Sequence, residues 1–139
     1  MSNIREFTTV ACPFDEVPDR LYAHFDGGDA VLPLRVRFGH LTVERDVDFH
    51  LKTKPAYPGY RLLDVSWTPK DGGPYPSFSG TLSVAEDAIG WCRIEIDGSY
   101  RPPFGIAGAA FDAAFGQRIA QATASELLAE IKRLLLKMN

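Results

Sequence analysis

A change in hydrophobic period near residue 105 constrains the fold of this chain more than any other feature. Before it, apolar residues recur mostly at every second position, as in half-buried strands. After it, from about residue 105 to residue 137, they recur with the 3.6-residue period of an amphipathic helix. A helix of that length is about 45 Å long, more than the diameter of a small domain. We therefore expect it to cross the whole face of a sheet.

The segments before the helix predict antiparallel strands separated by turns. The clearest of them alternates Val43, Val47, Phe49 and Leu51 with charged residues, which is typical of a sheet covered on one side only. The predicted strands span residues 4–11, 34–38, 43–51, 60–67, 78–84 and 91–100. Between the first two, Pro18 interrupts a helical spacing of apolar residues and predicts two short helices.

The side-chain pattern predicts which face of residues 60–67 is buried and how the second strand pairs with the third. In residues 60–67, an inward-facing set of Leu63, Val65 and Trp67 is favoured over one that buries the carboxylate of Asp64. For the second and third strands we expect a turn centred on His40 and Leu41. That turn pairs Phe38 with Val43, Val36 with Arg45, Arg37 with Glu44 and Arg35 with Asp46.

Size and charge exclude several classes of protein. The 139 residues suit a single domain spanning residues 1–139. With 15 basic against 18 acidic residues, the chain lacks the cationic surface that nucleic acids require. No apolar run of about 18 residues predicts a membrane span, and the absence of a signal peptide at the start predicts a cytoplasmic protein. In that compartment we expect Cys12 and Cys92 to be reduced, buried thiols.

Known catalytic motifs are absent from the sequence. It holds no G-x-S-x-G, H-E-x-x-H or P-loop pattern, and no spacing of cysteines and histidines that predicts a metal or a cofactor. His24, His40 and His50 fall at a helix end, in a turn and on a charged strand face, where surface histidines are common. Catalytic residues therefore remain unassigned.

Four stretches of the C-terminal half resemble a known superfamily: YPSFSGTL (75–82), GSYRPPFG (98–105), GAAFD (108–112) and QRIAQAT (117–123). Together with the order of elements, they resemble the START-like, or SRPBCC, superfamily, which includes Bet v 1-like and polyketide cyclase-like proteins. The resemblance implies an α+β helix-grip fold, in which a curved antiparallel sheet of six or seven strands wraps around a long C-terminal helix. It also implies a deep cavity for lipids, polyketides or other apolar molecules, but no universal catalytic residue.

Aromatic and apolar residues on the inward-facing positions are the candidate ligand-binding set: Phe38, Phe49, Trp67, Phe78, Ile94, Tyr100, Phe111 and Phe115. Composition leaves open whether these side chains line a pocket or fill it. The favoured hypothesis is binding of a small apolar molecule. The alternatives are a cyclase or dehydratase, in which Tyr100 acts with Glu95 or Asp112, and a protein-interaction or stress-related module. Whether the chain forms a homodimer is also left open.

Overall fold

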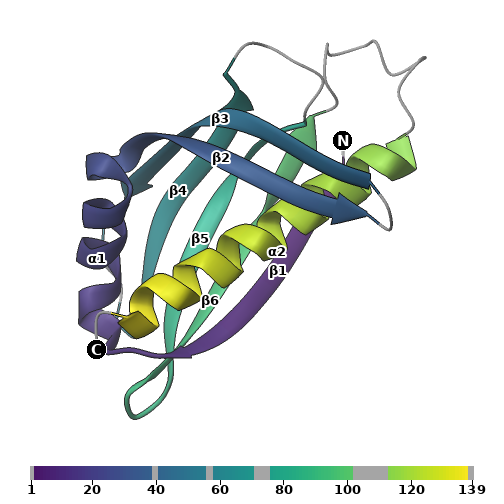
Figure 1. Ribbon diagram of the computed structural model, residues 1–139. Coiled ribbons are helices and arrows are strands. Elements are labelled where there is room, and N and C mark those ends of the chain that lie inside the picture. Colours follow the sequence, from purple (N-terminus) through teal and green to yellow (C-terminus); the bar gives the residue numbers. More distant parts are fainter. Residues whose placement is uncertain (1, 39–40, 56–57, 71–75, 102–112, 138–139) are drawn as a thin grey trace.

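The computed structural model describes residues 2–38, 41–55, 58–70, 76–101 and 113–137 (Figure 1). Strand β1 (Ser2–Ala11) is followed by the 3-10 turn η1 (Phe14–Glu16), helix α1 (Val17–His24) and the 3-10 turn η2 (Asp26–Gly28). Five strands come next: β2 (Asp29–Phe38), β3 (Leu41–Thr53), β4 (Tyr60–Pro69), β5 (Ser77–Ala88) and β6 (Trp91–Arg101). The described part ends with helix α2 (Ala113–Lys137).

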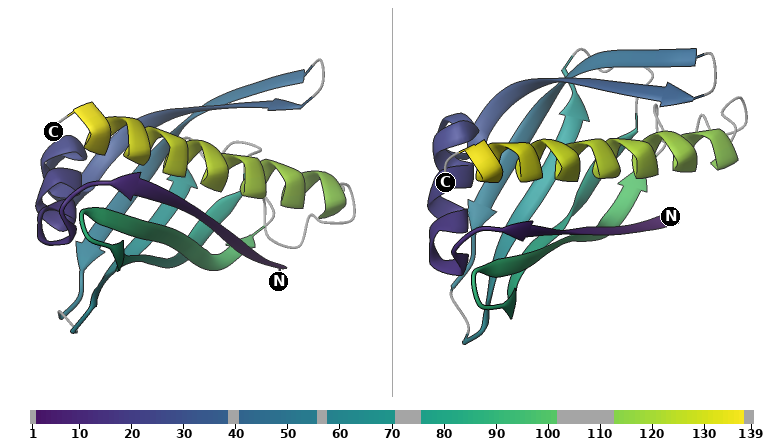
Figure 2. Two further views of the ribbon diagram at one scale, coloured as in Figure 1. Left: turned by 90° about the horizontal axis from the view of Figure 1, so that it is seen from below. Right: turned by 60° about the horizontal axis from the view of Figure 1, so that its bottom comes forward.

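The strands form one curled antiparallel sheet in the order β1-β6-β5-β4-β3-β2. Strands β2 to β6 follow one another as a meander, and β1 adds to the free side of β6. Helix α2 lies on the hollow side of the sheet, against the two edge strands β1 and β2 (Figure 2). The predicted helix-grip arrangement, with a long C-terminal helix held by a curved sheet, is confirmed.

Alternation of apolar and polar residues decides which face of each strand is buried. In β4, Leu63, Val65 and Trp67 are buried on the hollow side, as predicted. Asp64 points outward and lies 3.2 Å from the Nζ atom of Lys54. Burying the apolar set rather than the carboxylate avoids the cost of desolvating a charge.

The pairing of β2 with β3 differs from the sequence-based prediction. Phe38 pairs with Leu41 and Arg35 with Glu44, so each partner lies two residues closer to the turn than predicted. The Nε atom of Arg35 is 3.4 Å from a carboxylate oxygen of Glu44. Because the side-chain period of a strand is two, this shift leaves every residue on its predicted face, and the alternation cannot distinguish the two registers. Leu41 belongs to β3, and His40 lies outside the described residues.

Two element boundaries also have physical explanations. Strand β2 begins at Asp29 rather than at residue 34, and it includes Pro33. A proline is tolerated there because β2 is an edge strand, where one row of N–H groups needs no partner. Pro18 lies in the first turn of α1, which likewise needs no N–H donor. The predicted pair of short helical segments corresponds to the 3-10 turn η1 and the helix α1, and the boundary between them lies before Val17, one residue ahead of Pro18.

Helix α2 closes the interior with one apolar face. Its buried residues are Ile119, Ala120, Thr123, Ala124, Leu127, Leu128, Ile131 and Leu135. Among the described side chains of this face, Thr123 is the one buried residue with a hydroxyl, and it donates a hydrogen bond to the carbonyl of Ile119 at 2.7 Å. The helix therefore presents a hydrocarbon surface to the sheet. Among the described helices, none combines the length and apolarity needed to cross a membrane.

Candidate functional site

Four aromatic residues form a continuous line across the hollow side of the sheet. Phe49 of β3 pairs with Trp67 of β4, Trp67 pairs with Phe78 of β5, and Phe78 pairs with Tyr100 of β6. We call these four residues the aromatic row. All four belong to the candidate set taken from the sequence, and the structure brings them together. Their exposed fractions are only 1–3%, so they are packed against each other and against their surroundings.

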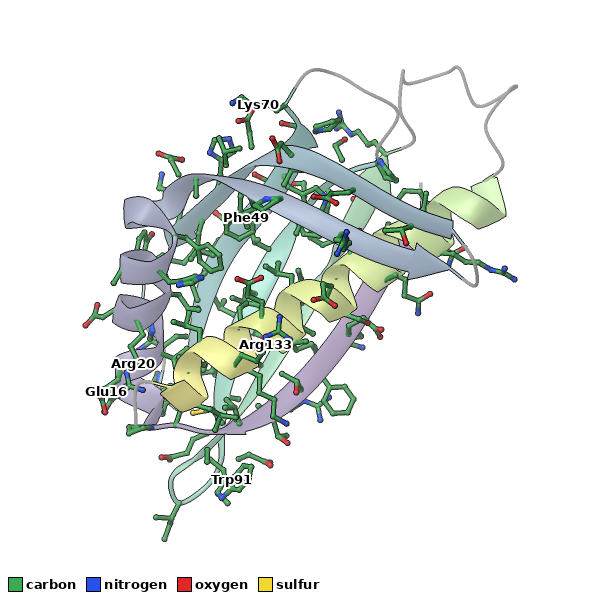
Figure 3. All side chains as sticks on the ribbon, in the orientation of Figure 1. Glu16, Arg20, Phe49, Lys70, Trp91 and Arg133 are labelled. Carbon is green, nitrogen blue, oxygen red and sulfur yellow. The ribbon has the colours of Figure 1, made fainter. Side chains whose placement is uncertain are left out.

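Ring contacts join two members of the aromatic row and link a third to the end of α1. The rings of Trp67 and Phe78 are stacked, with centroids 4.6 Å apart and planes inclined by 17°. Phe49 meets Phe25, the residue directly after α1, with centroids 4.8 Å apart. Figure 3 shows Phe49 on the hollow side of the sheet. Such aromatic pairs contribute about 0.5–1.5 kcal/mol each beyond the burial of their area.

Two glycines shape the sheet beside the aromatic row. Gly80 and Gly98 face each other across β5 and β6, two residues from Phe78 and Tyr100 respectively. A β-carbon at either glycine would collide with the backbone of the other strand. It would also lie 2.9 Å (from Gly80) or 2.7 Å (from Gly98) from the Cζ atom of Phe78. Only glycine permits this close approach of the strands, and the tip of the Phe78 ring covers the pair.

The remaining candidate residues lie elsewhere. Ile94 is fully buried on the same face but pairs with Val84, and it lies six residues along β6 from Tyr100, the member of the row on that strand. Phe38 lies in β2 and Phe115 in α2, and their side chains are outside the described part of the structure. Phe111 is outside the described residues altogether. The aromatic row is therefore the part of the predicted site that the structure brings together.

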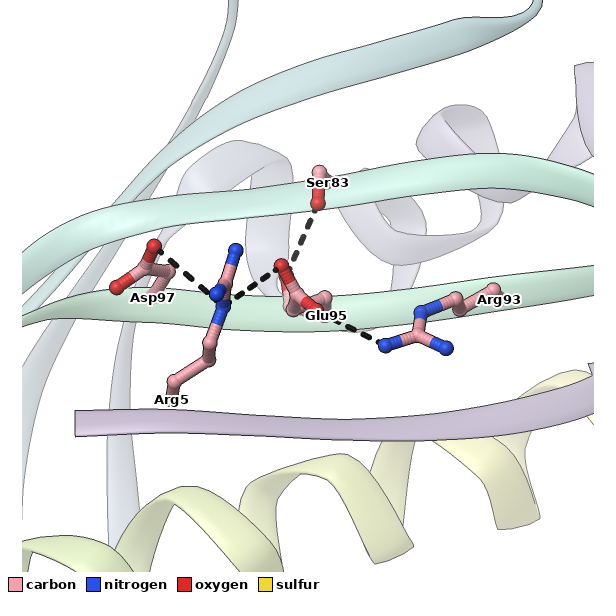
Figure 4. A network of polar contacts seen from close by, with 5 residues as sticks. All are labelled: Arg5, Ser83, Arg93, Glu95 and Asp97. Atoms are coloured by element: carbon pink, nitrogen blue, oxygen red, sulfur yellow. Dashed lines mark hydrogen bonds and ion pairs between the residues drawn. The ribbon is translucent and has the colours of Figure 1, made fainter.

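Glu95 does not share a face with Tyr100, which corrects one proposed catalytic pair. It lies on the outer face of β6, where its carboxylate oxygens are 3.3 Å from Arg5 Nε and 3.2 Å from Arg93 Nη2 (Figure 4). Arg5 also reaches Asp97 at 3.8 Å. Glu95 and Tyr100 are five positions apart. Because side chains alternate between the two faces of a strand, residues separated by an odd number of positions lie on opposite faces. Asp112, the other proposed partner, is outside the described residues.

Helix α1 closes one end of the hollow side. Arg20 is largely buried, and its guanidinium lies 3.0 Å from the carboxylate of Glu16 and 3.4 Å from the backbone oxygen of Leu135 in α2 (Figure 3). His24 lies 3.5 Å from Glu130 of the same helix. The contacts of Arg20 with Leu135 and of His24 with Glu130 join the two helices at the C-terminal end of α2. Sequence reasoning missed them because they link segments more than 100 residues apart.

Buried thiols lie at this same end of the interior. Cys92 donates a hydrogen bond to the backbone oxygen of Cys12 at 3.0 Å, and both residues are free and buried, as predicted. Burial raises the pKa of Cys92 to about 11, and the neighbouring Cys12 adds to that shift. Burial also raises the pKa of Cys12, although Arg20 opposes the effect. Because the thiolate is the reactive form, neither cysteine suits nucleophilic chemistry at neutral pH.

The outer face carries a line of polar residues parallel to the aromatic row. We call it the polar row: Asp29, His50, Ser66, Ser79 and Ser99, each paired with the next across β2 to β6. The Nδ1 atom of His50 is 2.6 Å from a carboxylate oxygen of Asp29. A groove of about 650 Å³ runs along part of this row. The side chains of Asp29 and His50 are largely exposed, so water and ions screen their interaction. The described residues form no cluster able to hold a metal ion.

The sequence anticipated one member of the polar row and missed its partner. His50 was expected on the charged face of its strand, and it lies there. The predicted second strand began only at residue 34, so the pairing of Asp29 with His50 was not foreseen. Extending the strand pattern back through Pro33 would have found it, because edge strands accept proline.

Known proteins match this chain in structure but not in sequence. A conserved protein from Geobacillus kaustophilus has a TM-score of 0.61 at 14% identity, covering 98% of this chain and 96% of that protein. A START superfamily protein from Mycobacterium smegmatis has a TM-score of 0.58 at 9% identity, covering 99% of each chain. The Zhui aromatase/cyclase from Streptomyces sp. R1128 has a TM-score of 0.55 at 17% identity, covering 98% of this chain and 92% of the other. A scan of protein families finds no match, and neither does a search of curated proteins.

Proposed function

This chain has the START-like fold, and on that premise we propose that it binds a small apolar molecule between the sheet and α2, against the aromatic row. The observation that carries the proposal is the alignment of Phe49, Trp67, Phe78 and Tyr100 across four adjacent strands. Together they gather much aromatic surface in a single layer on the hollow side of the sheet, the side on which α2 lies. A ligand in that layer would meet hydrocarbon and aromatic rings on both sides.

A bound ligand would replace contacts among buried apolar side chains with contacts between those side chains and itself. The rings occupy the space in the structure, so a ligand would take the place of side-chain atoms rather than of water. Apolar area removed from water stabilises the bound state by roughly 25 cal/mol per Å². A molecule with about 200 Å² of apolar surface therefore gains on the order of 5 kcal/mol from its own burial, before the cost of moving side chains.

Proton transfer is less well supported than binding. Among the described residues no carboxylate is buried, and Glu95 lies on the opposite face from Tyr100. An acid–base pair needs two polar groups within hydrogen-bond reach of one substrate. A carrier or binding role is consistent with an interior of hydrocarbon surfaces.

The two tryptophans provide a direct test. Trp67 belongs to the aromatic row and is 1% exposed, whereas Trp91 is 47% exposed at the start of β6 (Figure 3). The W91F variant leaves Trp67 as the single tryptophan, and W67F leaves Trp91. We expect 1-bromonaphthalene or 12-bromododecanoic acid to quench Trp67 fluorescence with a saturable curve, because bromine quenches on contact.

The W67F protein is the matched control, and its Trp91 fluorescence should show no saturable change. Thermal unfolding supplies a second readout, because a ligand that binds only the folded state raises Tm. The proposal is overturned if neither probe quenches Trp67 in the W91F protein and neither raises Tm.

A further inference from the structure

Phe78 differs from the rest of the aromatic row in what lies beside it. On β5 and β6, the positions two residues further along the inner face are Gly80 and Gly98, which carry no side chains. The Cζ atom of Phe78 lies within 3 Å of the points where β-carbons of both glycines would be. The ring of Phe78 thus fills space that two alanines at these positions would need.

Trp67 provides the stacking partner for this ring. Its plane is within 17° of the plane of Phe78, and the two centroids are 4.6 Å apart. Tyr100 is directly opposite Phe78 on β6. Among the described residues, the Phe78 ring therefore lies against an indole face and a patch of bare backbone, with a tyrosine at the paired position of β6. The same surroundings would accept the aromatic ring of a separate molecule.

Resting on the proposed function, we infer that the ring of Phe78 occupies the ligand-binding position in the free protein, and that the ligand carries a flat aromatic ring. When Phe78 turns about its Cα–Cβ bond, the incoming ring stacks on Trp67 and covers Gly80 and Gly98 in its place. The exchange keeps the stacked geometry and the contact with the glycines. Phe78 is thus a specificity-determining residue that occupies the site of the free protein.

The geometry favours an aromatic ligand over an acyl chain. A saturated chain is rounder than a ring and gains nothing from the quadrupole of the indole face, whereas an aromatic ring gains from an offset stack. A chain would also leave part of the flat space over the two glycines empty, with loss of contacts. The two brominated probes represent these two chemistries with the same quenching atom.

Removing the Phe78 ring tests the inference. In the W91F background, F78A should bind 1-bromonaphthalene about tenfold more tightly than W91F alone, because the ligand no longer competes with a side chain. The gain should be smaller for 12-bromododecanoic acid. Leu82 is the matched control, since it lies on the same face of β5, is 1% exposed and pairs with Leu63 rather than with Trp67. L82A also opens a cavity, but its affinity for 1-bromonaphthalene should stay within about twofold of W91F.

The outcomes separate this inference from the proposed function. If W91F binds a probe and F78A binds it no more tightly, Phe78 does not hold the site, although the interior still binds ligands. Equal gains in F78A and L82A, or a larger gain for the acyl probe, also overturn the inference, because any cavity would then explain the binding. If F78A does not fold, F78L replaces it and should give a smaller gain in the same direction. Failure of every variant to bind either probe overturns the proposed function itself.

Discussion

The two faces of the sheet are built from neighbouring residues and have opposite chemistry. In each strand from β3 to β6, a member of the aromatic row stands next to a member of the polar row: Phe49 and His50, Trp67 and Ser66, Phe78 and Ser79, Tyr100 and Ser99. The inner members are 1–3% exposed, whereas the side chain of His50 is 55% exposed. On the inner face, shape and volume should control stability and binding. On the outer face, charge and salt should matter, and only weakly.

Replacing a residue of each row at one point of β4 gives the largest contrast. W67A removes a buried indole and should lower the free energy of unfolding by about 3–5 kcal/mol, because the cavity it leaves cannot fully collapse. S66A, its immediate neighbour on the outer face, should change stability by less than about 0.5 kcal/mol. Urea denaturation of both variants measures the difference. Similar losses in the two variants would contradict the assignment of the faces.

A titration distinguishes the inner thiol from groups on the outer face. The folded state raises the pKa of Cys92 from 9.0 to about 11, so the folded protein holds this proton more tightly than the unfolded chain does. The contribution of this thiol to the free energy of unfolding is fully present below pH 9. It decreases by on the order of 2 kcal/mol as the pH rises towards 11.

Comparison with C92A isolates this thiol from the lysines and tyrosines that titrate in the same range. The stability of the wild type, measured by urea denaturation from pH 8 to pH 11, should fall more steeply than that of C92A. Parallel curves for the two proteins would show that Cys92 is not desolvated.

The ion pairs of Glu95 on the outer face should have the smallest effect. E95Q removes its contacts with Arg5 and Arg93, which are partly exposed, and should cost less than about 1 kcal/mol. Raising the salt concentration should abolish most of that cost, because ions screen exposed charges. Glu86, an exposed residue with no ion pair among the described residues, provides the control E86Q. A loss that persists at high salt would mean that the outer face contributes through packing as well.

Sequence patterns predicted which face of each strand is buried more accurately than they predicted which residues pair between strands. The inward set of Leu63, Val65 and Trp67 followed from the cost of burying Asp64, and the structure agrees. The β2–β3 register was wrong by two residues, because both registers bury the same side chains. The Asp29–His50 contact was missed because the predicted strand began at residue 34, after Pro33, whereas β2 begins at Asp29.

Residue order alone was enough to assign an antiparallel sheet, a long helix across it and an aromatic inner face. Those features depend on local periodicity and on the cost of burying charge, which can be read one segment at a time. The line of four rings, the facing glycines and the stack of Phe78 on Trp67 arise only when strands far apart in the chain pair in one register. Their placement is a property of packing, in which each side chain takes the volume that its neighbours leave.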